Sequence, residues 1–129
     1  MLSRYLFCLL LLLPAATYAS NAVDLEATMK SMGLALKQAR EAATPDAAKP
    51  YIVELTRLTT QAKTAKFPDE KAESFVTGLD KVLLSLSRAA AAAEAGDELQ
   101  LKEALAEVND LRKQYHKQRK VSFWQILFG

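Results

Sequence analysis

The sequence predicts an all-α protein, an antiparallel up-down-up-down four-helix bundle. In four successive stretches, apolar residues recur at alternating steps of three and four, which is the period of one helix face. Residues that favour turns separate these stretches, and no stretch alternates apolar and polar residues with the period of a strand. Helices of about 17 to 26 residues joined by short loops place consecutive helices antiparallel.

The first nineteen residues are interpreted as an export signal that is removed. A basic start at Arg4 precedes an apolar run from Leu6 to Leu13, and small residues up to Ala19 supply a cleavage site. The run is shorter than the roughly 20 residues that a membrane-spanning helix needs. We therefore expect a signal peptide over 1–19 and a single domain over 20–129.

Composition excludes several classes of site in the mature chain. The only cysteine, Cys8, lies inside the signal, which excludes disulfides, thiolate metal sites, a cysteine nucleophile and covalent haem attachment through Cys-x-x-Cys-His. Without Arg4, sixteen basic residues stand against fifteen acidic ones. This near-neutral balance, with both signs interspersed, predicts no nucleic-acid partner.

The first two helices are predicted from their apolar faces. The first, over 22–43, ends at the turn residues Thr44-Pro45-Asp46, and Gly33 within it is either a tolerated glycine or a point of close approach. The second is expected to start at Pro50, whose backbone angle suits a first helical position, and to end before Phe67-Pro68-Asp69. Their faces are, in order, Leu25, Met29, Met32, Leu36, Ala39 and Ala43, then Tyr51, Ile52, Leu55, Leu58, Ala62 and Ala65.

The third and fourth helices meet at Gly96 and Asp97. Glycine adopts the left-handed conformation at a helix end without steric penalty, so Gly96 ends the third helix. Asp97, with Gln100 three residues later, starts the fourth in a pattern related to the capping box. The two faces are Ala72, Phe75, Leu79, Val82, Leu83, Leu86, Ala89 and Ala93, then Leu101, Leu105, Val108, Leu111 or Arg112, and Tyr115.

Met29 and the only histidine, His116, are expected at the same level of this bundle. Met29 lies about 7 residues, or roughly 10 Å, from the start of the first helix, and His116 lies a similar distance from the end of the antiparallel fourth. Each residue also has a simpler interpretation. A methionine on an apolar face usually fills the core, and a histidine late in a basic helix usually belongs to a solvated cluster of cations.

Three segments resemble the cytochrome b562 family. They are Asp24-Leu25-Glu26-Ala27-Thr28-Met29, Phe75-Val76-Thr77-Gly78-Leu79-Asp80 and Arg112-Lys113-Gln114-Tyr115-His116, and the resemblance extends over 22–120. It implies a periplasmic electron-transfer protein that binds one noncovalent haem b, with Met29 and His116 as the two axial ligands of the iron. Methionine and histidine together leave no coordination position open for oxygen or substrate.

The resemblance also assigns residues around the haem. Arg112 resembles an arginine that lies beside the haem and pairs with a propionate, although an ordinary surface charge explains it equally well. Tyr115, Met32, Phe75 and Leu79 would line or flank the ring, or simply belong to the core. Leu79 stands where the family has an aromatic residue, and Met32 is an alternative sulfur ligand. The connection around Phe67-Pro68 is shorter than in the best-known member of the family.

The segment 121–129 and the choice of function leave alternatives. After a basic cluster, this apolar tail holds the only tryptophan, Trp124. Either it continues the fourth helix and packs on the end of the bundle, or it contacts a membrane surface or a redox partner protein. The rival to a haem carrier is a haem-free periplasmic interaction or stress-adaptor protein. An enzyme is not expected, and a monomer or weak dimer is.

Overall fold

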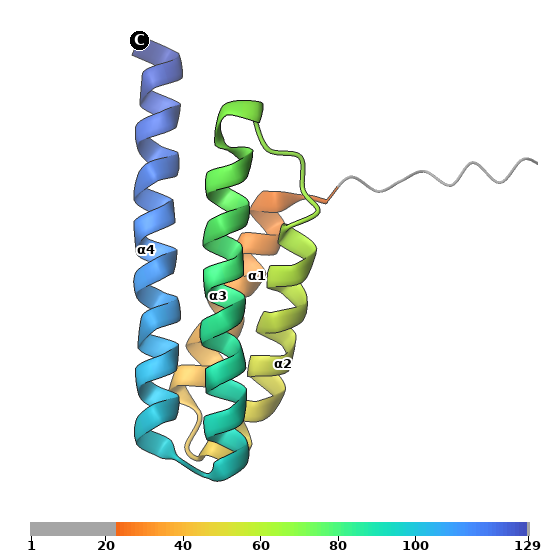
Figure 1. The fold of residues 1–129 in the computed structure, drawn as a ribbon, viewed down its shortest axis with the longest axis vertical. Coiled ribbons are helices and arrows are strands. Elements are labelled where there is room, and N and C mark those ends of the chain that lie inside the picture. Colours follow the sequence, from red (N-terminus) through yellow and green to blue (C-terminus); the bar gives the residue numbers. More distant parts are fainter. Residues whose placement is uncertain (1–22, 129) are drawn as a thin grey trace, which may run out of the picture.

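The computed structural model describes residues 23–128, which form four α-helices. They are α1 (Leu25–Glu41), α2 (Pro45–Ala62), α3 (Asp69–Ala95) and α4 (Glu98–Phe128). Each helix runs antiparallel to the one before it, in up-down-up-down order (Figure 1). The predicted fold class is confirmed. The predicted signal over 1–19, with Cys8, lies outside the described residues.

Polar caps fix where α1 begins and where α3 gives way to α4. The Asp24 carboxylate accepts a hydrogen bond from the Ala27 amide at 3.1 Å, which satisfies one of the donors that every helix start leaves unpaired. Between α3 and α4, Gly96 has φ of 68°. The Gly96 amide donates a hydrogen bond to the Ala93 carbonyl, and the Asp97 amide donates one to the Ala92 carbonyl. This is a Schellman motif. Gly96 and Asp97 therefore end α3 and start α4, as predicted.

The predicted start of α2 at Pro50 is wrong, because the helix begins five residues earlier. Thr44 caps it by accepting a hydrogen bond from the Ala47 amide at 3.1 Å, and Pro45 is the first helical residue. Thr44-Pro45 is thus a helix start and not merely a turn. Pro50 lies inside the helix, where it cannot donate to the Asp46 carbonyl. Burial of Ala48 and Ile52, each 1% exposed, outweighs that loss.

Two further predicted boundaries shift by a few residues. α1 ends at Glu41, so Ala43, predicted on its inner face, lies beyond the helix and is exposed. α2 ends at Ala62, and a turn carries the chain past Ala65, whose amide bonds to the Ala62 carbonyl at 3.1 Å. Helix ends depend on caps more than on the apolar pattern.

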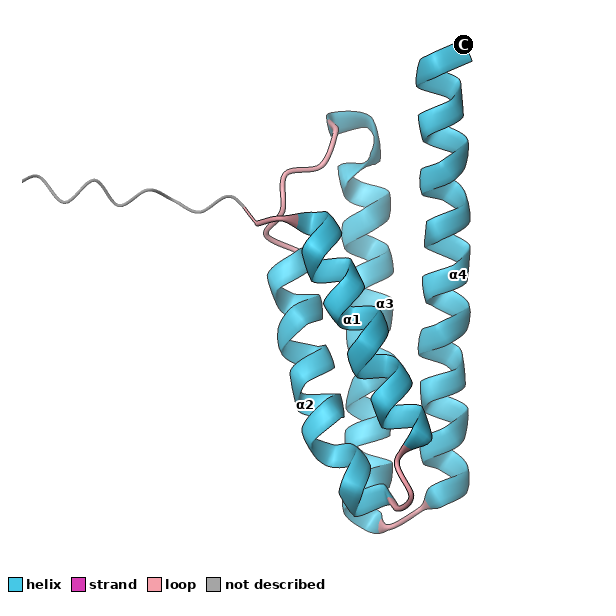
Figure 2. Cartoon of the chain, turned by 180° about the vertical axis from the view of Figure 1, so that it is seen from behind, coloured by secondary structure: helices cyan, strands magenta, loops and turns pink. Residues whose placement is uncertain are grey.

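The core at the end of the bundle where α3 passes into α4 is made largely of small side chains. Its buried side chains there are mostly alanines, namely Ala35, Ala39, Ala48, Ala89, Ala92, Ala93 and Ala104. Small side chains let helices approach closely. Larger residues follow toward the other end, and α1 packs against α4 much less than against α2. Figure 2 shows α4 leaning away from α1 toward the end at which α1 begins.

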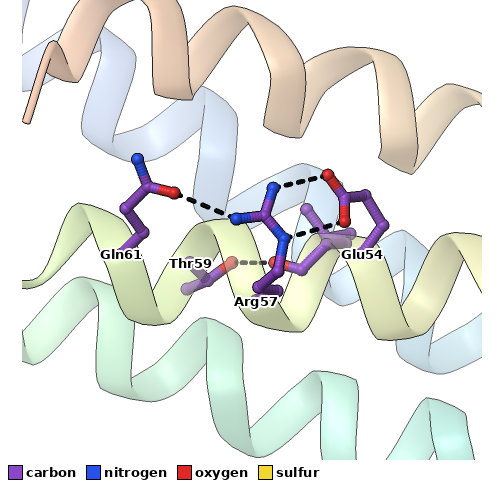
Figure 3. Close-up of polar contacts among 5 residues, drawn as sticks. Glu54, Arg57, Thr59 and Gln61 are labelled. Atoms are coloured by element: carbon purple, nitrogen blue, oxygen red, sulfur yellow. Dashed lines mark hydrogen bonds and ion pairs between the residues drawn. The ribbon is translucent and has the colours of Figure 1, made fainter.

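Ion pairs lie on the outer surface, and some of them join neighbouring helices. Lys49 of α2 reaches Glu94 of α3 at 3.2 Å, and Arg88 of α3 reaches Glu107 of α4 at 2.6 Å. On α2 alone, the Arg57 guanidinium donates two hydrogen bonds to Glu54, at 2.7 and 2.9 Å, and one to Gln61 (Figure 3). Exposed pairs of this kind contribute little to stability.

α4 is the longest helix, with 31 residues, and it extends past the other three helices (Figures 1 and 2). The extension lies at the end of the bundle at which α1 begins. The helix of the first interpretation of the apolar tail is present up to Phe128. Its predicted packing on the end of the bundle concerns side chains that lie outside the described ones. Among residues 23–128, no helix is both long enough and apolar enough to cross a membrane.

Candidate functional site

A cavity of about 520 Å³ opens inside the bundle at the end where α1 begins. All four helices and the α2–α3 connection contribute to its wall, which is mostly apolar. This volume lies within the range of pockets that hold small ligands and cofactors. The lining residues are Leu25, Met29, Met32, Leu36, Leu55, Lys66, Phe67, Pro68, Glu70, Lys71, Phe75, Gly78, Leu79, Val82, Val108, Leu111, Arg112, Tyr115 and His116.

Met29 and His116 reach this cavity from antiparallel helices. The Asp24 cap sets the start of α1, and the Thr28 hydroxyl reinforces it by donating to the Asp24 carbonyl at 2.8 Å. Met29 lies one turn after Leu25, the first residue of α1, and is half-buried. His116 on α4 is also half-buried. The structure thus brings the two residues to one cavity. The predicted distances of about 7 residues from the helix ends are wrong, because Met29 lies four residues from the start of α1 and His116 lies twelve from the end of α4, which extends past the bundle. That they act as metal ligands remains a prediction.

The other predicted site residues line the same cavity. Met32 comes from α1, Phe75 and Leu79 from α3, and Arg112 and Tyr115 from α4. Phe75 and Leu79 are one turn apart, so both fall on the face of α3 that meets the cavity. With Leu79 in this wall, an aliphatic side chain occupies the position where an aromatic one was expected from the resemblance.

Tyr115 packs directly on the backbone of α3 at Gly78. A Cβ atom added to Gly78 would lie 2.6 Å from both Cε atoms of the Tyr115 ring, far inside normal contact distance. Gly78 is buried, so the ring occupies the space that any other residue would fill. Gly33 has open space around its Cα, which favours the interpretation of a tolerated glycine. Spacing alone did not reveal that Gly78 seats the residue before His116.

Arg112 is held at the edge of the cavity by a neighbour on its own helix. Its Nε and Nη2 donate to the Oδ1 of Asn109 at 3.4 and 3.3 Å. Asn109 is buried, whereas Arg112 is exposed. These hydrogen bonds are long and therefore weak. Arg112 is thus part of the cavity lining and makes only weak hydrogen bonds to Asn109.

The α2–α3 connection closes one side of the cavity. Phe67 stacks on Phe75 with ring centroids 5.2 Å apart and planes inclined by 15°, an arrangement that stabilises aromatic pairs. Lys66, Pro68 and Lys71 also line this side. The connection therefore contributes to the pocket although it is short. Its phenylalanine was identified from the sequence only as part of a helix break.

Three ionisable groups with shifted pKa values lie outside the cavity lining. Hydrogen bonds to Asp46 and Glu94 raise the pKa of Lys49. The hydrogen bonds between Arg57 and Glu54 lower the pKa of the Glu54 carboxyl and raise that of the guanidinium. All three are on α2 and face solvent. We assign these shifts to surface pairing and not to the site.

The fold and the cavity together define a four-helix-bundle protein with a mostly apolar internal pocket. The pocket offers two thioethers from α1, those of Met29 and Met32, and one imidazole from the antiparallel helix α4, among mostly apolar side chains and with the Arg112 side chain in its lining. The family model of cytochrome b562 matches residues 24–120, about three quarters of the chain. The chain belongs to the cytochrome b562 family. This is a family of haem-binding electron carriers and not typically of enzymes. No curated protein matches the chain.

Proposed function

We propose that this protein is a periplasmic electron carrier that binds one noncovalent haem b per chain, with Met29 and His116 as the axial ligands of the iron. The observation that carries the proposal is the cavity of about 520 Å³ that both residues line, one from each of two antiparallel helices. A thioether and a neutral imidazole form the ligand set of cytochromes whose role is electron transfer. The apolar wall suits the porphyrin face.

The surrounding residues would bind and orient such a group. The Arg112 guanidinium can form a charge-assisted pair with a propionate carboxylate, and Lys66 and Lys71 add positive charge to the cavity lining. Phe75 and Leu79 would pack against the ring from α3. Tyr115, seated on Gly78, restricts where α4 can place the adjacent His116. Met32 is a second sulfur in the same wall.

Bound haem would supply a one-electron couple, and ligation by methionine together with histidine raises its reduction potential. The protein's part is to hold both ligands on a stable bundle and to keep bulk water from the ring. With both axial positions occupied by side chains, no position remains for a substrate. Redox partner proteins would exchange electrons at the end of the bundle where the cavity opens.

The periplasmic location rests on the export signal expected over 1–19. Expression of the whole chain followed by release of the periplasmic fraction tests it. We expect the mature protein, beginning near Ser20, in that fraction. A full-length chain retained with the cytoplasm would contradict the location without affecting the haem site.

Absorption spectroscopy tests the ligands. The wild-type protein with haem should show the sharp visible bands of a low-spin, six-coordinate b-type haem. Met29→Ala and His116→Ala should each lose that spectrum. Met32→Ala is the matched control, because it removes a sulfur from the same helix and cavity, and it should keep the low-spin bands. Loss of the bands in Met32→Ala but not in Met29→Ala would transfer the sulfur ligand to Met32.

Thermal melting separates this function from that of a haem-free interaction module. A ligand that binds only the folded state raises stability, by about 2.7 kcal/mol at a hundredfold excess over its dissociation constant. We therefore expect haem to raise the melting temperature of the wild-type protein. A wild-type protein that takes up no haem and melts unchanged in its presence would refute the proposal.

A further inference from the structure

Charge is distributed very unevenly between the C-terminal segment and the rest of the chain. Residues 111–129 contain five basic residues and no acidic one, whereas residues 1–110 contain twelve basic and fifteen acidic residues. The net charge of +2 therefore combines a segment of +5 with a remainder of −3. The basic residues of the segment are Arg112, Lys113, Lys117, Arg119 and Lys120. A basic end on an otherwise acidic chain is typical of binding to an anionic surface.

An apolar segment follows directly after this basic cluster. From Val121 to Phe128, only Ser122 and Gln125 are polar, and three of the ten aromatic residues of the chain are Phe123, Trp124 and Phe128. At 100° per residue the apolar positions occupy most of the circumference of a helix and not a single stripe. A helix that is apolar nearly all round is surrounded by apolar material. One neighbouring helix does not provide that.

The bundle itself does not surround this segment. α4 continues to Phe128, twelve residues or roughly 18 Å beyond His116. Figures 1 and 2 show its last turns extending past the ends of α1, α2 and α3. They do so at the end of the bundle where the cavity opens. Lys117, Arg119 and Lys120 thus lie along α4 between the cavity-lining residue His116 and the apolar segment.

We propose that residues 117–128 dock the protein on an anionic lipid bilayer. Lys117, Arg119 and Lys120 would lie at the level of the lipid phosphates, and the apolar segment would enter the boundary with the acyl chains. The segment is too short to span a bilayer, but basic residues beside tryptophan and phenylalanine suit the interface. The inference does not depend on haem, because Lys117, Arg119, Lys120 and the helix extension are not part of the cavity lining.

Vesicle binding by the mature full-length chain tests this surface. Trp124 is the only tryptophan, so its emission reports on the segment alone. We expect a blue shift and co-sedimentation with phosphatidylcholine vesicles that contain phosphatidylglycerol, much weaker binding to pure phosphatidylcholine, and loss of binding at high salt. Each basic residue near an anionic surface contributes about fivefold in the partition constant, so Arg119→Gln with Lys120→Gln should weaken binding about 30-fold.

The matched control removes the same charge from the opposite end of the bundle. Lys37→Gln with Lys102→Gln alters two side chains that are 69% and 70% exposed, at the end of α1 and the start of α4, and should leave binding within about twofold. Phe123→Ser with Phe128→Ser keeps the tryptophan and should lose the blue shift. Equal binding to neutral and anionic vesicles would overturn the proposal. So would an equal loss in the control, or self-association through the segment without vesicle binding.

Discussion

Replacement of Gly78 by alanine should destabilise the bundle, although glycine is a poor helix former. In an open helix interior the change would stabilise the protein by about 1 kcal/mol. Here the new Cβ would clash with Tyr115 Cζ and lie 2.6 Å from both Cε atoms of the ring, whereas carbon atoms prefer about 3.5 to 4.0 Å, so the ring must move by about 1 Å. Overpacking of this kind costs about 1–3 kcal/mol. The expected net loss is therefore up to about 2 kcal/mol.

The chain supplies its own control in Gly33, which lies inside α1 with open space where the Cβ of an alanine would lie. Gly33→Ala should stabilise the protein by about 0.5–1 kcal/mol. Urea unfolding of both variants measures the difference, which should equal the overpacking term of about 1–3 kcal/mol. For a domain of this size 1 kcal/mol corresponds to about 4–8 °C in melting temperature.

The same pair of variants tests whether Tyr115 positions its neighbour His116. Displacement of the ring should weaken haem binding in Gly78→Ala, while Gly33→Ala should bind haem as the wild type does. If Gly78→Ala proved as stabilising as Gly33→Ala, the ring would not be seated on the glycine. Close packing of the Tyr115 ring would then not explain the glycine at position 78 of α3.

Two further predictions concern α2. Pro50→Ala restores the amide that can donate to the Asp46 carbonyl. In urea titrations it should therefore raise the free energy of unfolding by about 1–3 kcal/mol. An unchanged free energy would mean that the rigidity of the proline offsets the missing hydrogen bond. Hydrogen bonds from Arg57 lower the pKa of Glu54, so their contribution is present above the carboxyl's unfolded pKa and is lost as pH falls through its folded pKa. In Arg57→Gln, an NMR titration should find that the pKa of Glu54 has risen; an unchanged pKa would contradict the pairing.

Helix identity was predictable because the apolar period is long and regular, whereas helix boundaries depended on single caps. Gly96 and Asp97 could be recognised because glycine and an acidic cap have strong positional preferences. The start of α2 was missed because Thr44-Pro45 reads equally well as a turn and as a capped helix start. The difference is made by tertiary burial of Ala48, four residues later, which no local pattern expresses.

The site was predictable to the level of which residues share the cavity, because antiparallel topology fixes which parts of α1 and α4 lie side by side. Counting about 7 residues from each helix end did not give the right distances, because Met29 lies four residues from the start of α1 and α4 extends twelve residues beyond His116. Both residues still lie near the end of the bundle at which α1 begins. The seat of Tyr115 on Gly78 and the stack of Phe67 on Phe75 did not follow from the sequence. Both depend on how closely two elements approach, and that distance is set by packing across the whole bundle.

The division of the core into two ends explains how one small bundle can both fold and retain a cavity. At the alanine-rich end, around Ala39 and Ala92, close helix contacts supply stability that needs no cofactor. At the other end, the cavity takes the place of those helix contacts, and α1 packs against α4 much less than against α2. Because the helices are already fixed relative to one another at the packed end, little ordering would remain to oppose binding at the open one. The contacts missing from the cavity wall are then available to a ligand that fills it.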